Sequence, residues 1–194
     1  SGFEMDFSDL QTSFALDIDT LGGALVHTPS VSFVTSESKT RDGGTPDVTD
    51  ADAFEAGYQA AYTFGALQNY TLSGAIQYRR ERFDSSNFVA GGTRQREELS
   101  YVADLQAQVT DALFVQGALR WEDSDTFEDF LSFSLSGSYT IFETGTRLRA
   151  SIGRAQTDPG FTEQFGFSGT NVPNPDLKPE QNFGFDLGID QAFF

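Results

Sequence analysis

Seven arginines lie within or beside segments in which apolar and polar residues alternate, so the parity of each position predicts the face that it occupies. Four have the parity of the polar residues and are predicted to point inward: Arg79, Arg94, Arg96 and Arg120. Three have the parity of the apolar residues and are predicted to point outward: Arg80, Arg82 and Arg154. A guanidinium forms bidentate, charge-assisted hydrogen bonds with phosphates and carboxylates. The inward set is therefore a candidate for attracting an anionic ligand, and the outward set for binding phosphate.

The same arginines have acidic neighbours that offer a simpler role. Four glutamates share their segments: Glu81, Glu97, Glu98 and Glu122. Ion pairs between adjacent strands would give the arginines a structural function and leave no free cation for a ligand. Both roles are open at the level of sequence.

Other candidate chemistry is weak. One acidic stretch, Glu122, Asp123, Asp125, Glu128 and Asp129, carries the oxygens that calcium prefers, but it lacks the glycine at the sixth position of an EF-hand loop. A solvated loop also accounts for these charges. The single histidine, His27, cannot build a histidine-based zinc site, and the chain has no cysteine. We therefore predict no catalytic residues, no metal site and no cofactor, and expect that the protein is not an enzyme.

The composition favours strands over helices. Phenylalanine and glycine contribute 20 and 19 of the 194 residues, which suits strands joined by tight turns. No segment approaches the roughly 18 consecutive apolar residues of a membrane-spanning helix. A membrane protein of this composition would have to be a barrel, in which alternation hides the apolar face. The net charge of −17 argues against nucleic acid as a partner.

Period-2 alternation predicts about nine strands. The clearest runs from Leu131 to Ile141, where serines and Thr140 interleave with apolar residues. Others cover 54–64, 70–78, 99–109, 113–121 and 183–193, with weaker candidates at 12–18, 31–35 and 148–152. Their connections are short at 65–69, 110–112 and 142–145, and long and polar at 37–52, 83–94, 122–129 and 155–182. Short turns on one side and long loops on the other are typical of bacterial outer-membrane barrels.

A soluble β-sandwich is the structural alternative, because its strands also alternate. Two observations argue against it. The predicted strands reach roughly a dozen residues, longer than the usual 5 to 6. Their polar faces also carry Gln, Ser, Thr and Asp instead of the Lys and Glu of solvated surfaces.

One segment near the end of the chain has a sequence that fixes its backbone. It consists of Asn174, Pro175, Asp176, Leu177, Lys178, Pro179 and Glu180. The two prolines hold φ and push the preceding residues into extended conformations, while Asn174 and Asp176 favour turns. A rigid, non-helical return from a long loop into a strand follows, and we expect these seven residues to be structural. Lys178 and Glu180 are candidates for ion pairs at the rim.

Together with Arg154-Ala155 and the segment Pro159 to Phe165, this motif resembles the late-barrel signature of TonB-dependent outer-membrane receptors. The resemblance covers roughly the second half of the chain. One departure is Asp158, where relatives usually place a small or apolar residue. The resemblance implies an all-β, antiparallel transmembrane β-barrel segment of about nine strands within a larger plugged barrel. Such barrels have about 22 strands, so residues 1–194 are expected to form a partial barrel domain without a plug, truncated at both ends.

The resemblance also implies the function. The family takes up scarce ligands such as siderophores, cobalamin or glycans across the bacterial outer membrane, with energy supplied by a TonB-type protein that contacts regions absent here. Expected partners are a small-molecule ligand and outer-membrane lipid or lipopolysaccharide. The outward arginines would contact lipopolysaccharide phosphates, and the inward arginines would contact the ligand or the plug. A passive porin-like barrel and a soluble β-sandwich binding module are the alternatives.

Overall fold

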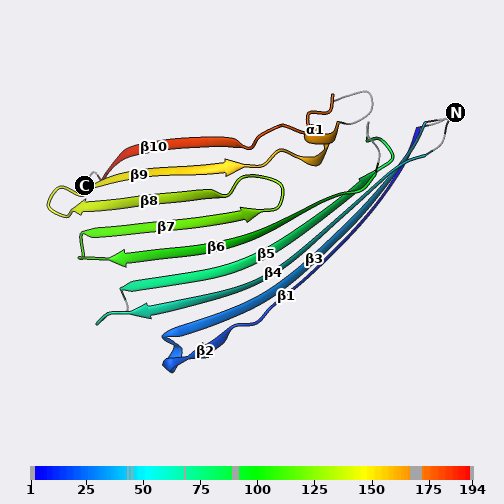
Figure 1. Cartoon of the computed structure of the whole chain (residues 1–194). Coiled ribbons are helices and arrows are strands. Elements are labelled where there is room, and N and C mark those ends of the chain that lie inside the picture. The colour runs from blue at the N-terminus through cyan, green and yellow to red at the C-terminus, as the bar shows by residue number, and fades with distance from the viewer. Residues whose placement is uncertain are drawn as a thin grey trace.

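The computed structural model describes residues 3–42, 44, 46–67, 69–88, 92–166 and 172–192. Ten strands form one antiparallel sheet, and almost every strand pairs with its neighbour along the chain (Figure 1). The strands are β1 (Phe3–Ala15), β2 (Ile18–Thr20), β3 (Leu25–Asp42), β4 (Asp47–Phe64), β5 (Tyr70–Ser85), β6 (Arg94–Gln108), β7 (Leu113–Ser124), β8 (Phe130–Ile141), β9 (Thr146–Thr157) and β10 (Glu180–Gln191).

The antiparallel all-β prediction is confirmed, with ten strands where about nine were expected. The short strand β2 pairs only with β3, and β1 and β10 form the two edges of a sheet that is not closed. All strands belong to a single sheet, so no second layer covers either face. The two-sheet sandwich alternative is therefore wrong for the part of the chain that the structure describes.

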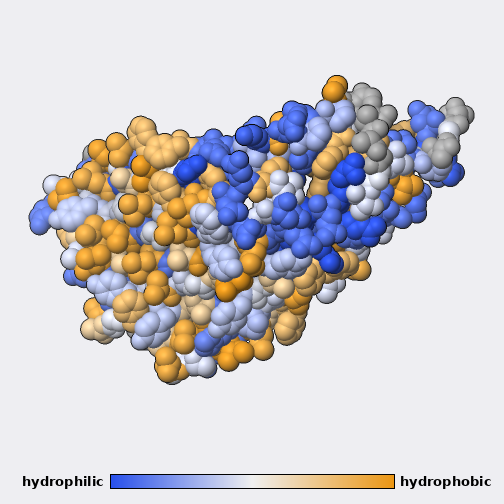
Figure 2. Space-filling model, viewed as in Figure 1, coloured by the Kyte–Doolittle hydropathy of each residue, from blue (hydrophilic) through white to orange (hydrophobic). Residues whose placement is uncertain are grey.

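The two faces of the sheet differ in polarity. Large apolar side chains of the central strands are exposed on one face, which we call the apolar face: Leu72, Ile76, Tyr101, Leu105, Leu119, Leu131, Leu135 and Ile152. Figure 2 shows hydrophobic residues concentrated towards the end of the sheet that carries the short turns, and hydrophilic residues towards the opposite end. An exposed apolar surface this large marks a site of contact with another protein or with a membrane. The opposite face, which we call the polar face, carries serine, glutamine, arginine and glutamate.

Several strands continue far beyond this apolar belt. At about 3.3 Å per residue, the 18-residue strands β3 and β4 are each about 60 Å long, more than twice the apolar band of roughly 25 Å in outer-membrane barrels. Along β5 the apolar face changes from Ile76 and Tyr78 to the exposed Arg80 and Arg82. The long-loop ends of these strands are therefore polar on both faces.

This extension corrects the predicted loop over 37–52. Instead of a long loop, β3 reaches Asp42 and β4 starts at Asp47. Most of these residues are polar at consecutive positions, which is typical of a loop, because both faces of the strands are polar there. The pairing of Glu37 with Asp50 and Ser38 with Thr49 shows that the ladder nevertheless continues.

The long connection between β9 and β10 contains α1 (Phe161–Phe165), a helix of five residues. The backbone N–H of Gly160 donates to the Glu163 carboxylate, 2.7 Å away, and so closes the first turn. Among the described residues, no helix has the length and apolar character needed to cross a membrane.

Candidate functional site

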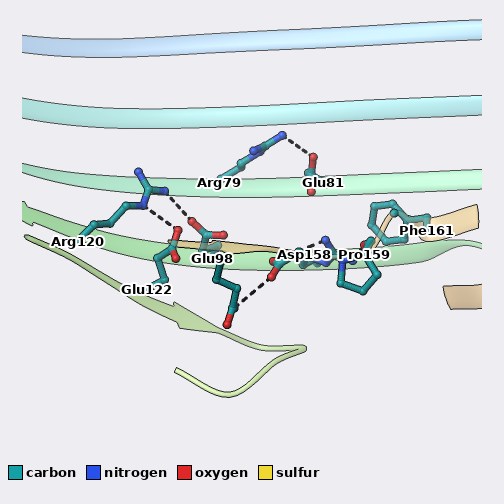
Figure 3. Close-up of a pocket in the computed structure, with 11 residues that line it drawn as sticks. Arg79, Glu81, Glu98, Arg120, Glu122, Asp158, Pro159 and Phe161 are labelled. Atoms are coloured by element: carbon teal, nitrogen blue, oxygen red, sulfur yellow. Dashed lines mark hydrogen bonds and ion pairs between the residues drawn. The ribbon is translucent and has the colours of Figure 1, made fainter. Parts of the chain in front are cut away.

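A polar pocket of about 380 Å³ lies on the polar face near the long-loop ends of β5, β6, β7 and β9 (Figure 3). The strands contribute Arg79, Glu81, Arg96, Glu98, Arg120, Glu122 and Gln156, and the start of the β9–β10 connection contributes Asp158, Pro159, Gly160 and Phe161. Alternation places the pocket residues of β5, β6 and β7 on one face, because the two that each strand contributes are two positions apart. Three of the four inward arginines therefore meet in one pocket.

Arg120 is the hub of the pocket. Its Nε donates to Glu122 at 2.8 Å, and its Nη2 donates to Glu98 at 3.0 Å and to the Ser100 hydroxyl at 2.9 Å. The contact with Glu122 runs along β7, and the contact with Glu98 crosses to β6. Ser100, which is 1 % exposed, also donates to Glu98 at 2.7 Å. Arg120 thus holds two carboxylates together on the polar face of β6 and β7.

Arg79 is the most accessible of these arginines. Its Nη2 donates to Glu81 at 2.6 Å, and half of its side chain (51 %) is exposed. The pocket as a whole holds three arginines and four carboxylates, so its charge is nearly balanced. Ion pairing, the simpler role that the sequence offered, is thus present for Arg79 and Arg120. Ligand binding by these residues stays a prediction.

Arg96 lies at the closed end of the pocket and is 7 % exposed. Its Nη2 donates to the carbonyl of Pro159 at 3.0 Å, and its Nη1 is 3.8 Å from the Asp158 carboxylate. The guanidinium lies 4.8 Å from the ring centroids of both Phe127 and Phe161. Nearby, the guanidinium of Arg94 is 4.6 Å from the ring of Phe165. Aromatic rings thus surround the two arginines of β6 that were candidate ligand contacts.

Asp158 sits just after β9, outside the strands. Burial raises the pKa of its carboxyl group, while Arg96 and a hydrogen bond from Gln156 act in the opposite direction. A carboxyl group whose pKa is raised by folding binds protons more readily in the folded state, so the folded form gains stability as the pH falls. The gain is complete below the ordinary aspartate pKa of about 3.9, and it is lost as the pH rises through the raised value.

We therefore expect Asp158→Asn to abolish one component of the pH dependence of stability. As the pH is lowered from 7 to 4, the urea midpoint of the parent should rise relative to that of the variant. Unfolding curves of both proteins at matched pH values measure this difference. Glu163→Gln, which changes an exposed carboxylate on the same loop, is the control. A parallel pH response of the parent and Asp158→Asn would contradict the expectation.

The outward arginines lie where the apolar belt ends. Arg80 and Arg82 are exposed and border a shallow pocket with Phe33, Asp52 and Phe54. Neither makes an ion pair within 4.0 Å among the residues that the structure describes. Their guanidinium groups are free to meet a phosphate group from outside the chain.

The third member of the outward set, Arg154, is differently placed. Its Nη2 donates to Gln181 at 2.9 Å, and its guanidinium lies 4.4 Å from the ring of Phe130. It is therefore held by neighbouring strands, unlike Arg80 and Arg82.

The motif from Asn174 to Glu180 lies between α1 and β10. The backbone N–H of Asn174 donates to the carbonyl of Gln164 at 3.0 Å, and the Gln164 side chain donates to the carbonyl of Pro175 at 3.2 Å. The motif thus attaches to the helix and leads into β10 at Glu180. Lys178 and Glu180 make no ion pair within 4.0 Å in the described ranges, so the proposed rim pairs are not seen there.

Sequence analysis did not single out two further arginines on the polar face. Arg147 and Arg149 of β9 border a pocket with Ser136, Ser138 and Ser151. Arg147 donates to Ser138 at 3.2 Å, and Arg149 pairs with Asp190 at 3.1 Å. The signal was available, because both arginines have the polar parity of the weak strand predicted at 148–152.

Residues 2–194 match the model of the family described as TonB dependent receptor-like, beta-barrel. The vitamin B12 transporter BtuB of Vibrio vulnificus (strain CMCP6) is 27 % identical over 133 residues, which are 65 % of this chain and 20 % of that protein. The sheet also resembles two solved receptor structures, one from Pseudomonas aeruginosa and one from Acinetobacter baumannii. A G324V mutant of the ferric enterobactin receptor PfeA of P. aeruginosa has a TM-score of 0.80 and 16 % identity, with 96 % of this chain and 32 % of that chain covered. The siderophore receptor PirA of A. baumannii has a TM-score of 0.76 and 17 % identity, with 96 % and 33 % covered.

Proposed function

Because the chain belongs to the TonB-dependent receptor-like β-barrel family, we propose that it forms part of the wall and rim of an outer-membrane receptor for energy-coupled uptake of a scarce ligand. The observation that carries the proposal is the exposed belt of apolar side chains on one face of a sheet whose other face is polar. A sheet of this kind fits between hydrocarbon and an aqueous or plugged lumen. The chain spans about a fifth of the length of BtuB and about a third of the PfeA and PirA structures described above, so the rest of such a receptor would supply the plug and the remaining strands.

The ligand would be a small molecule of the siderophore, cobalamin or glycan type. The names of the relatives, a vitamin B12 transporter, a ferric enterobactin receptor and a siderophore receptor, support the cobalamin and siderophore types. Of the inward arginines, Arg79 is the one best placed to contact an anionic ligand, because half of its side chain is exposed at a pocket of about 380 Å³. Arg96 and Arg120 would act mainly by holding the shape of that pocket, while Arg94 lies outside it, against Phe88 and Phe165.

The proposed location is the bacterial outer membrane, with a TonB-type protein as the energy-coupling partner. Lipopolysaccharide is the proposed lipid partner at the outer rim. Arg80 and Arg82 support it best, because they lie at the outer end of the apolar belt and have no ion pair among the described residues. Arg154 has neighbours within the sheet and would contribute less.

Uptake by the full-length receptor that contains this segment should depend on TonB. In a strain that lacks its own receptors, expression of that receptor should restore growth on a limiting ferric siderophore or on limiting cobalamin, and deletion of the TonB gene should abolish the effect. Residues 1–194 alone should give no growth at either genotype, because they complete neither a plug nor a closed wall. Growth that persists without TonB would favour the passive porin-like alternative. Growth supported by the segment alone would refute the proposal.

A further inference from the structure

The β9–β10 connection folds back over the polar face and contacts strands that precede it by more than 60 residues. The ring of Phe161 stacks on that of Phe83 of β5, with 5.7 Å between centroids and 17° between planes. The ring of Phe165 meets that of Phe88 edge-on at 6.2 Å. Phe88 is 5 % exposed, although it belongs to a connection at the rim. The helix α1 and the ends of β5 and β6 therefore share a small aromatic core.

Arg96 closes this core from the side of β6. Its guanidinium lies between the rings of Phe127 and Phe161, at 4.8 Å from each centroid, and donates to the carbonyl of Pro159. A cation buried between two rings and bound to a backbone carbonyl is oriented on three sides. The distance of 3.8 Å to Asp158 adds an attraction without a hydrogen bond. Arg96 thus joins two connections, β7–β8 and β9–β10, to strand β6.

The same connection forms one side of the pocket around Arg79. Figure 3 shows Asp158, Pro159 and Phe161 on the side away from Arg120 and Glu122. Gln156, Asp158, Pro159, Gly160 and Phe161 all line the pocket. A displacement of α1 would therefore open the pocket on this side, while the ion pairs of Arg120 within β6 and β7 would be unaffected.

Hydrogen bonds also attach the C-terminal end of α1 to the motif from Asn174 to Glu180. Gln164 is 5 % exposed, and it bonds to the motif twice, through its carbonyl to the N–H of Asn174 and through its side chain to the carbonyl of Pro175. Helix α1 is therefore attached to β6 through Arg96 and to the start of β10 through the motif.

We propose that Arg96 is a positioning residue that clamps the β9–β10 connection onto the polar face, so that this connection is a fixed wall of the ligand pocket throughout uptake. The proposal rests on the proposed function for its link to uptake. It predicts that the loss of Arg96 weakens ligand capture without stopping transport, because the residue shapes the pocket but does not have to touch the ligand. It also predicts that α1 keeps its place whether or not ligand is bound.

Spin labels on the full-length receptor test the position of α1 directly. The chain has no cysteine, so Thr162→Cys on α1, which leaves the contact between Glu163 and Gly160 intact, and Asp50→Cys on β4 add two labelling sites to this segment. In the parent, the interspin distance measured by pulsed electron resonance should be narrow, and a ferric siderophore or cobalamin that the receptor transports should not shift it. Arg96→Ala and Phe161→Ala should each broaden the distribution. Arg147→Ala, which removes an arginine on the same face whose bond is to Ser138, should leave it narrow.

Uptake kinetics separate positioning from general damage. We expect Arg96→Ala to raise the ligand concentration for half-maximal uptake roughly tenfold, which corresponds to about 1.4 kcal/mol, with the maximal rate kept within about twofold. Arg96→Lys, which retains the charge without the planar group, should fall between the parent and Arg96→Ala. If the receptor shows no TonB-dependent uptake of any ligand, the proposed function fails, but the distance measurement still decides the clamp. A broad distribution in the parent, a ligand-induced shift, or an unchanged distribution in Arg96→Ala would each overturn the clamp.

Discussion

Leu135→Arg is expected to destabilise the membrane-inserted receptor by about 2 to 4 kcal/mol, the cost of arginine on the lipid face near the bilayer midplane. Leu135 is the third of the five apolar-face residues that run from Leu131 to Tyr139 in β8, and 56 % of it is exposed. Its partners across the sheet are Gly117 and Ile152, which offer no carboxylate to pair with a guanidinium. The new charge would therefore have to reach the interface by deforming the wall or the bilayer.

The matched control uses the adjacent position on the other face. Ser134 is exposed on the polar face, between Ala118 and Gly153, so that an arginine there has space and contact with the lumen. Ser134→Arg should change the free energy of unfolding of the receptor in lipid vesicles, measured by urea titration, by less than about 0.5 kcal/mol, as usual for surface substitutions. Equal losses in the two variants, or no loss in Leu135→Arg, would show that the apolar face does not meet hydrocarbon.

The sequence predicts the central part of this sheet because its two faces differ in polarity, which gives the sequence a period of two residues. Within the apolar belt of β5 to β8 the residues on one face are apolar or small and those on the other are mostly polar, so the residue types indicate their faces directly. The prediction fails where this constraint ends. β1 starts at Phe3 instead of near residue 12, and β3 extends to Asp42 instead of ending near residue 35. At the ends of β3 and β4 both faces are polar, so the alternation disappears although the ladder continues.

Helix α1 could not be predicted for a different reason. A five-residue helix is far below the length at which intrinsic propensity stabilises a helix in water. Its stability derives from contacts with Phe83, Phe88 and Arg96, which are distant in sequence. Local pattern carries no information about such contacts.

The site shows the same division between local and long-range information. Parity indicates that Arg79, Arg96 and Arg120 share a face, and the structure brings them into one pocket. Parity does not indicate which arginine is exposed and which is enclosed. That depends on the register of β6 against β7 and on the return of Pro159 to Arg96 across 63 positions. The same limit applies to Asp158. The sequence shows that this residue departs from the family pattern, but not that it lies beside Arg96.

Arg120→Glu should cost about 2 to 4 kcal/mol of stability, because it converts an ion-pair hub into a cluster of three carboxylates. Breaking a fully buried pair costs about 3 to 5 kcal/mol, and the partial exposure of Arg120, Glu98 and Glu122, at 37 %, 18 % and 21 %, reduces that figure. The hydroxyl of Ser100, which is 1 % exposed, also loses the guanidinium that it accepts from. The urea midpoint of the membrane-inserted receptor measures the loss.

A charge swap distinguishes electrostatics from packing. In Arg120→Glu/Glu122→Arg, the two charges exchange places two residues apart on β7, and position 122 lies opposite Ser100, within diagonal reach of Glu98. The swap should therefore recover at least half of the stability that Arg120→Glu loses. Arg147→Glu, at a position whose arginine bonds to a neutral serine, should cost less than half as much as Arg120→Glu. If the swap remains as unstable as Arg120→Glu, the cost derives from the shape of the guanidinium and not from its charge, and Arg120 would then be a packing residue of the wall.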